Sequence, residues 1–351
     1  MHNLKIKYET KLLLILVLAL LSFLSVEFLF TSSKERNDAL KMNEAVSLAE
    51  TWFNKIELMK KGKGIISDAE TNIKHSGLIG NEFTDITTTL GSLEAKEIAT
   101  NPEFAALIVK YLTDSNIDST KKVGLILSGS FPSLSVSSLA AIQTLKLKAI
   151  IFSSLGASMF GANQPGATWL DIENYLIKNS GLKYKSNLVT PGAETDNGGG
   201  LSEEGGQILK TTAADYNVDL YFPHSINESI DRKVDILLKN KIDLLINIGG
   251  NQTSLGACVH SLNIPNGFHK KIESCGDEDR GIIMRLNEKG IPFINLLNIK
   301  DLAIRNEISI NPSVASLESI YKEKKYEKIP AAFSLLILSG LIFLIRKKKQ
   351  L

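Results

Sequence analysis

Short apolar segments alternate with longer amphipathic segments between residues 123 and 296, and this alternation constrains the fold more than any other feature. Short apolar runs bounded by Gly, Pro or Asp are typical of buried strands, and the segments between them have helical periodicity. The expected strands are 123–127, 148–152, 187–189, 219–222, 243–248 and 292–296. The expected helices are 134–145, 169–180, 201–216, 226–240, 253–261 and 281–289. The pattern predicts an α/β fold with a Rossmann-like, doubly wound, mostly parallel sheet.

The region before this alternation reads differently. Residues 34–61 are polar with recurring apolar positions, which predicts an amphipathic helix. A loop-rich stretch follows, and Asn101-Pro102 then marks the start of a helix that extends to about residue 113. The run Thr87-Thr88-Thr89-Leu90-Gly91 within the loop-rich stretch has no spacing that assigns it a role.

Both ends of the chain are apolar and have cations on their outer side. Residues 12–30 contain one charge, Glu27, and follow Lys5, Lys7 and Lys11. Residues 329–345 are apolar and precede four adjacent cations at 346–349. Segments of this length are near what a bilayer requires, so two terminal transmembrane helices are expected. A cleavable signal peptide is the alternative at the first segment, and a buried helix at the second.

The positive-inside rule then places both ends in the cytoplasm and the intervening domain on the outer side of the cell membrane. The membrane would accordingly be a partner of this two-pass protein. The expected divisions are a cytoplasmic N-terminus (1–11), a transmembrane helix (12–30), a membrane-proximal helical region (31–121), an extracytoplasmic α/β domain (122–328), a transmembrane helix (329–345) and a cytoplasmic tail (346–351).

Charge and cysteine content limit the possible partners and cofactors. The net charge of +2 gives no reason to expect a nucleic acid partner. Cys258 and Cys275 are the two cysteines, and an outer compartment would permit a disulfide between them, although two separate thiols fit the spacing equally well. Neither these cysteines nor the five histidines have the spacing of metal ligands, so no metal is expected and the cofactor is unknown.

Four expected strands end in loops rich in small residues, at 128–133, 153–169, 190–206 and 249–256. Ligands of open parallel sheets bind outside the carboxyl ends of the strands, where small residues let them approach the backbone. Gly and Ser are also ordinary turn residues, so any one loop is weak support for a site. The candidate ligand-binding residues are Ser128, Gly129, Ser130, Ser158, Asn163, Gly249, Gly250 and Asn251.

Known catalytic motifs fit these loops poorly. The chain has no phosphate-binding G-x-x-x-x-G-K-[ST] sequence, and residues 156–161 only approach the nucleophile elbow G-x-S-x-G. A serine hydrolase also needs a base, and no spacing links His224 or His260 to a serine. The carboxylates near the same edge have two interpretations: they act as catalytic acid and base, or, more simply, they cap helices and solvate loops. They are Asp171, Glu173, Glu194 and Asp196. No catalytic residue is assigned from these patterns.

Several long blocks resemble one family. They are "TTTLGSLEAKEIATNPEFAALIVKYL", "SGSFPSLSVSSLAA", "SSLGASMFGANQPGATWLDIE" and "GGGLSEEG", all between residues 75 and 256. In these blocks the chain resembles the family called poly-gamma-glutamate system protein. The resemblance implies a membrane-anchored accessory component of the machinery that makes and exports this surface polymer. It implies no established reaction.

We therefore expect an extracytoplasmic component of a poly-gamma-glutamate synthesis or export system, with the polymer and the synthase or export subunits as partners. Two alternatives remain open. One is a hydrolase or transferase that acts on gamma-glutamyl bonds of the polymer, and the other is a surface module that binds a solute or the polymer.

Overall fold

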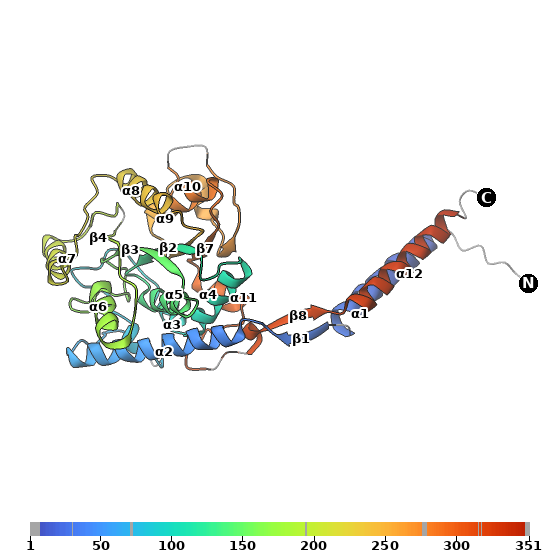
Figure 1. Ribbon diagram of the computed structural model, residues 1–351, viewed down its shortest axis with the longest axis horizontal. Helices are drawn as coiled ribbons and strands as arrows, with labels where there is room; N and C mark the ends of the chain where they lie inside the picture. Colours follow the sequence, from blue (N-terminus) through green and yellow to red (C-terminus); the bar gives the residue numbers. More distant parts are fainter. Residues whose placement is uncertain are drawn as a thin grey trace, which may run out of the picture. The chain divides into compact units, whose positions relative to one another are not determined.

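The computed structural model describes residues 8–29, 31–70, 73–193, 195–275, 279–314, 316 and 318–347 (Figure 1). Residues 1–7 and 348–351, which include much of the expected cytoplasmic ends, lie outside the described residues. The chain divides into two compact units. Unit 1 comprises Met1–Asn37 and Tyr321–Leu351, and unit 2 comprises Asp38–Ile320.

Unit 1 pairs the two ends of the chain. Its helices are α1 (Tyr8–Leu29) and α12 (Lys328–Lys347), and its strands are β1 (Thr31–Glu35) and β8 (Lys322–Tyr326). The strands form an antiparallel ribbon, and the helices lie side by side (Figure 1). The carboxylate of Glu27 forms an ion pair with Lys324, with 2.8 Å between Nζ and Oε1.

The expectation of two transmembrane helices requires correction. Among the described residues, none of the helices combines the length and the apolar character needed to cross a membrane. Both apolar segments are helical, but they pack against each other, and Glu27 in the first of them is ion-paired. This finding overturns both the expected spans at 12–30 and 329–345 and the expected two-pass location in the cell membrane.

Unit 2 is an α/β fold with a mixed six-stranded sheet. The strands are β2 (Lys122–Ser128), β3 (Lys148–Ser154), β4 (Leu188–Thr190), β5 (Leu244–Ile248), β6 (Gly267–His269) and β7 (Phe293–Leu296). Their order is β4-β3-β2-β5-β7-β6, and β6 runs antiparallel to β7 at one edge while the other neighbours are parallel. The order reverses between β2 and β5, where a crevice opens at the carboxyl ends of open α/β sheets.

Two parts of the sheet differ from the sequence-based expectation. Residues 219–222 form no strand, and Leu220 makes only an isolated bridge to Val189. Strand β6 was not expected, because it is a three-residue segment that follows Pro265-Asn266 and has no alternating pattern.

Helices cover both faces of the sheet (Figure 1). On one side, α5 (Pro132–Thr144) packs against α2 (Ala39–Gly62) and α4 (Glu103–Asp114). On the other side, α8 (Ile226–Lys239) packs against α9 (Gln252–Leu255) and α10 (Ile282–Glu288). The remaining helices are α3 (Leu93–Ala99), α6 (Trp169–Ser180), α7 (Glu203–Asp215), α11 (Ile299–Arg305) and the 3-10 segments η1 (Ser76–Leu78), η2 (Val259–Asn263) and η3 (Glu318–Tyr321).

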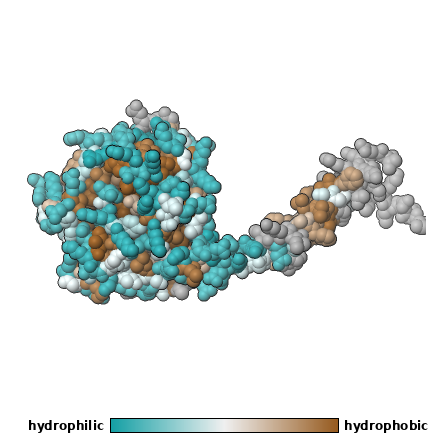
Figure 2. Space-filling view, viewed as in Figure 1, coloured by the Kyte–Doolittle hydropathy of each residue, from teal (hydrophilic) through white to brown (hydrophobic). Residues whose placement is uncertain are grey.

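The core of unit 2 includes residues from the region before the alternation. Trp52 and Phe53 of α2 and Phe104 of α4 are fully buried. Burying such aromatic side chains removes a large apolar area from water and stabilises the fold. The face of unit 2 seen in Figure 2 is mostly hydrophilic, with apolar side chains between the polar ones.

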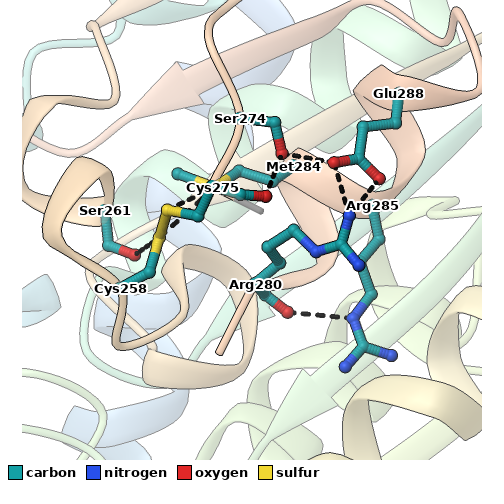
Figure 3. The surroundings of a disulfide bond; sticks show 8 residues. All are labelled: Cys258, Ser261, Ser274, Cys275, Arg280, Met284, Arg285 and Glu288. Atoms are coloured by element: carbon teal, nitrogen blue, oxygen red, sulfur yellow. Dashed lines mark hydrogen bonds and ion pairs between the residues drawn. A yellow bond between two sulfur atoms is a disulfide. The ribbon is translucent and has the colours of Figure 1, made fainter. Parts of the chain in front are cut away.

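Cys258 and Cys275 form a disulfide, with 6.5 Å between their Cα atoms (Figure 3). Both cysteines are buried, and Met284 Sδ lies 3.7 Å from Cys258 Sγ and 3.9 Å from Cys275 Sγ. The disulfide decides between the two possibilities that the spacing left open. It closes the segment that carries β6.

Candidate active site

A cavity of about 520 Å³ lies at the carboxyl ends of β2, β3 and β5, at the point where the strand order reverses. Five of the eight residues expected at a ligand site line it: Ser128, Ser130, Ser158, Gly250 and Asn251. A further wall comes from residues 88–92, which precede α3, and from Ala95 and Lys96 on α3 itself. The structure thus brings all four small-residue loops together, since Ala193 of the loop at 190–206 also lines the cavity, and adds a fifth segment that was not expected there.

The other three expected residues support the loops from outside the lining. The amide of Asn163 joins two loops, because its Oδ1 accepts from the Asn81 N–H at 3.0 Å and its Nδ2 donates to the Asn81 carbonyl at 2.8 Å. Gly129 lies so close to the carbonyls of residues 154–156 that a Cβ there would be 3.0–3.1 Å from them. Gly249 has a φ of +85°, which glycine adopts without strain.

Lys96 is the residue that changes the chemistry of this cavity. It lies on α3, a helix capped by Ser92, whose Oγ accepts from the Ala95 N–H. Its side chain is 3% exposed. Its Nζ lies 2.9 Å from Ser158 Oγ, contacts the carbonyl oxygen of Ser130, and lies 3.5 Å from the centroid of the Phe131 ring.

Burial lowers the pKa of Lys96 from 10.5 to about 7. Removing an ammonium from water disfavours its charged form. A substantial fraction of Lys96 is therefore a neutral amine near pH 7. In that form Nζ has a lone pair that can take the proton of the Ser158 hydroxyl 2.9 Å away, which is the arrangement of a general base beside a nucleophile.

Backbone hydrogen bonds hold Ser158 in place after β3. The Thr88 N–H donates to the Ala157 carbonyl at 2.8 Å, and the Met159 N–H donates to the Thr89 carbonyl at 3.0 Å. The Ser158 N–H itself donates to Ser130 Oγ at 2.9 Å. Because both neighbours of Ser158 are bound to residues 88–89, its side chain has a defined position against Lys96.

Gly91 keeps the space next to Ser158 open. A Cβ at this position would lie 3.0 Å from Ser158 Oγ and 2.6 Å from the Met159 carbonyl oxygen. Side chains do not tolerate such contacts, so only glycine allows the segment before α3 to approach Ser158 this closely. The Thr-Leu-Gly run that had no assigned role thus forms one wall of the cavity.

The other expected acids and bases lie elsewhere. Neither His224 nor His260 lines this cavity, and Asp171 caps its own helix through the Thr168 N–H. Asp196 is buried in an ion pair with Lys233, and Glu194 lies outside the described residues. Glu173 accepts from Ser186, and burial raises its pKa. Within the described part of the chain, Lys96 is the one lining residue that ionises near neutral pH.

The sequence contains one local signal for the helix that carries Lys96. Ser92 followed by Leu93 and Glu94 is a helix start, with a capping hydroxyl and an acidic first turn. Lys96 belongs to this short helix, and Ile98 and Ala99 on the same helix are buried. No spacing rule, however, connects a lysine on this helix with a serine after β3.

Comparison with protein-family models, curated proteins and solved structures finds no match to this chain. No group of three or more His, Cys, Asp or Glu side chains is placed to hold a metal ion in the described ranges. The geometry therefore defines the class of site on its own: a cavity with a serine hydroxyl next to a buried amine, called here the Ser158–Lys96 dyad.

Proposed function

We propose that this protein is a component of a poly-gamma-glutamate synthesis or export system and that it hydrolyses or transfers gamma-glutamyl amide bonds of the polymer. The observation that carries the chemistry is the 2.9 Å contact between Lys96 Nζ and Ser158 Oγ. The identity of the polymer rests on the family resemblance, and the sequence blocks that carry this resemblance contain Lys96, Ser130 and Ser158. The polymer and the synthase or export subunits would be its partners.

The dyad supplies the first step of acyl transfer. Neutral Lys96 takes the Ser158 proton while Ser158 Oγ attacks the carbonyl carbon of the amide. The carbon–nitrogen bond then breaks, the leaving amine takes up a proton, and an acyl-enzyme remains on Ser158. Water would resolve this intermediate in a hydrolase, and a second amine would do so in a transferase.

The lining suits a polymer that carries a carboxylate on every residue. The cavity exposes serine and threonine hydroxyls and the side chains of Asn251 and Gln252. Hydroxyl and amide groups donate hydrogen bonds to a carboxylate. No Asp or Glu is among the described lining residues, so an acidic chain would meet no like charge there.

The test uses the purified full chain and poly-gamma-glutamate of defined length. We expect the wild type to shorten the polymer, and a phosphonylating serine probe to label Ser158 in peptide mapping. Ser158→Ala and Lys96→Met should abolish shortening. Ser135→Ala is the matched control, because Ser135 is a buried serine on α5 whose Oγ has no partner among the described residues.

The result also separates the remaining alternatives. Retention of the polymer without shortening, together with an unlabelled Ser158, would refute the catalytic proposal and favour a polymer-binding component. Equal loss of shortening in Ser135→Ala would show that the effect of Ser158→Ala is a general effect on the fold.

A further inference from the structure

Ser130 contacts both members of the Ser158–Lys96 dyad. Its Oγ accepts the Ser158 N–H at 2.9 Å, and its carbonyl oxygen accepts a hydrogen bond from Lys96 Nζ. Its own N–H donates to Ser128 Oγ at 3.1 Å, which holds the turn after β2. Ser130 is half-buried and lines the cavity, so a bound substrate would reach it.

The hydrogen of the Ser130 hydroxyl has no acceptor among the described residues. The hydrogen bond that Ser130 Oγ makes there is one that it accepts, from the Ser158 N–H. A hydroxyl has one donor hydrogen and two lone pairs, and the Ser158 N–H takes one of the lone pairs. Ser128, the other hydroxyl of this turn, has no such contact with Lys96 or Ser158. Ser130 is therefore the hydroxyl that can donate toward a group bound at Ser158.

Amide chemistry requires a donor at this place. When the carbon–nitrogen bond breaks, the nitrogen leaves as an amine only if it receives a proton, because an alkylamide anion is too basic to leave. An activated aryl ester has no such requirement, since its phenolate leaves without a proton. A residue that protonates the leaving group therefore affects amides far more than activated esters.

We propose that Ser130 is a catalytic residue that donates its hydroxyl proton to the leaving nitrogen, an inference that rests on the proposed acyl-transfer function. Ser158 first gives its proton to Lys96 and forms the bond to the carbonyl carbon. The tetrahedral intermediate then collapses, Ser130 Oγ–H protonates the leaving nitrogen, and the Lys96 ammonium returns a proton to Ser130. The amine leaves with the Ser130 proton, the proton that Ser158 lost replaces it on Ser130, and Lys96 is neutral again.

The contacts keep Lys96 next to both serines. Lys96 Nζ donates to the Ser130 carbonyl oxygen and lies 2.9 Å from Ser158 Oγ, so the ammonium formed at Ser158 stays beside the residue that carries the donating hydroxyl. The Ser158 N–H also fixes Ser130 Oγ beside the residue that carries the nucleophile.

The test compares two substrates with the same acyl group, a gamma-linked glutamate oligomer and the gamma-glutamyl 4-nitrophenyl ester. Ser130→Ala should lower kcat/KM for the oligomer by about 100-fold or more and leave the ester within about threefold of the wild type. Ser130→Cys, which keeps a proton donor of similar size, should retain more of the oligomer rate. Thermal unfolding of each variant checks the fold.

Ser92→Ala is the structural control. It removes the cap of the helix that carries Lys96, so both rates should fall by the same factor. If Ser130→Ala loses activity equally on both substrates while the phosphonylating probe still labels Ser158, the role of Ser130 is refuted and the acyl-transfer function is not. An unlabelled, inactive wild type would refute the acyl-transfer function and the role of Ser130 with it.

Discussion

Lys96 Nζ and Ser158 Oγ lie 2.9 Å apart although 62 residues separate them in the chain. Three structural features produce this contact. Ser92 starts the helix that carries Lys96, backbone hydrogen bonds join residues 88–89 to residues 157–159, and Gly91 leaves room for the close approach. The contact places a buried amine against a hydroxyl.

The pH dependence of the reaction should follow Lys96. Because the neutral amine is the base and its pKa is about 7, kcat/KM should rise with pH below that value and level off above it. Steady-state rates on the gamma-glutamyl ester between roughly pH 5.5 and 9 would measure this profile, because this range extends to both sides of the pKa of Lys96. A rate that decreases as the pH rises through 7 would contradict the assignment of Lys96 as the base.

Lys96→Met should stabilise the protein at low pH. The folded pKa of Lys96 is lowered, so the unfolded state binds more protons between about pH 7 and 10.5, and the wild type gains stability as the pH rises through this window. Methionine removes the cost of the buried ammonium. We expect the variant to have a higher free energy of unfolding than the wild type at pH 6, and the difference to shrink as the pH rises toward 10. Urea unfolding at both pH values tests this, and a variant less stable at pH 6 would contradict it.

Gly91→Ala should impair activity more than folding. The added methyl group would lie 3.0 Å from Ser158 Oγ and would displace the backbone next to the nucleophile. We expect a loss of about 100-fold or more in kcat/KM, because small displacements of reacting groups have effects of this size. Gly206→Ala on α7 is the matched control, since a Cβ there meets nothing within 4 Å. Similar activity in the two variants would show that Gly91 has no role at the site.

Gly249 and Gly250 should respond differently to alanine. Gly249 has a φ of +85°, so Gly249→Ala should lower the free energy of unfolding by about 1 kcal/mol or more. Gly250 is not in this conformation and lines the cavity, and its added methyl group would meet mainly the flexible end of Leu297 at 3.1 Å. Gly250→Ala should therefore change the KM for the polymer and leave stability nearly unchanged. The opposite pattern in urea unfolding and kinetics would reverse the two assignments.

Removing the disulfide should affect stability and spare the dyad. Cys258 and Cys275 are 17 residues apart, and a loop of this size predicts a loss of about 3 kcal/mol when the disulfide is removed. The double variant Cys258→Ala/Cys275→Ala, measured by thermal unfolding, should show this loss. Labelling of Ser158 should persist below the unfolding temperature, because neither cysteine lines the cavity. Loss of labelling in the folded variant would show that the disulfide also positions the site.

The alternation of apolar and amphipathic segments was sufficient to predict most of the sheet. Strands β2, β3, β5 and β7 lie within a few residues of their expected places, because buried parallel strands are continuous apolar runs that pattern alone reveals. Short edge elements carry a weaker pattern, which is why β6 was missed and residues 219–222 were assigned wrongly. The terminal apolar segments were recognised as helices, but composition did not show that the two helices pack against each other.

The amino-acid sequence by itself determined the α/β class and the small-residue loops at the ends of β2, β3 and β5. The tertiary structure alone decided which of those loops form a cavity and which side chains meet in it. Lys96 shows the physical reason. An exposed lysine is a cation near pH 7, and only burial against Phe131 and Ser158 removes the water that keeps it charged. Burial depends on how distant segments pack, and no local pattern in the chain records it.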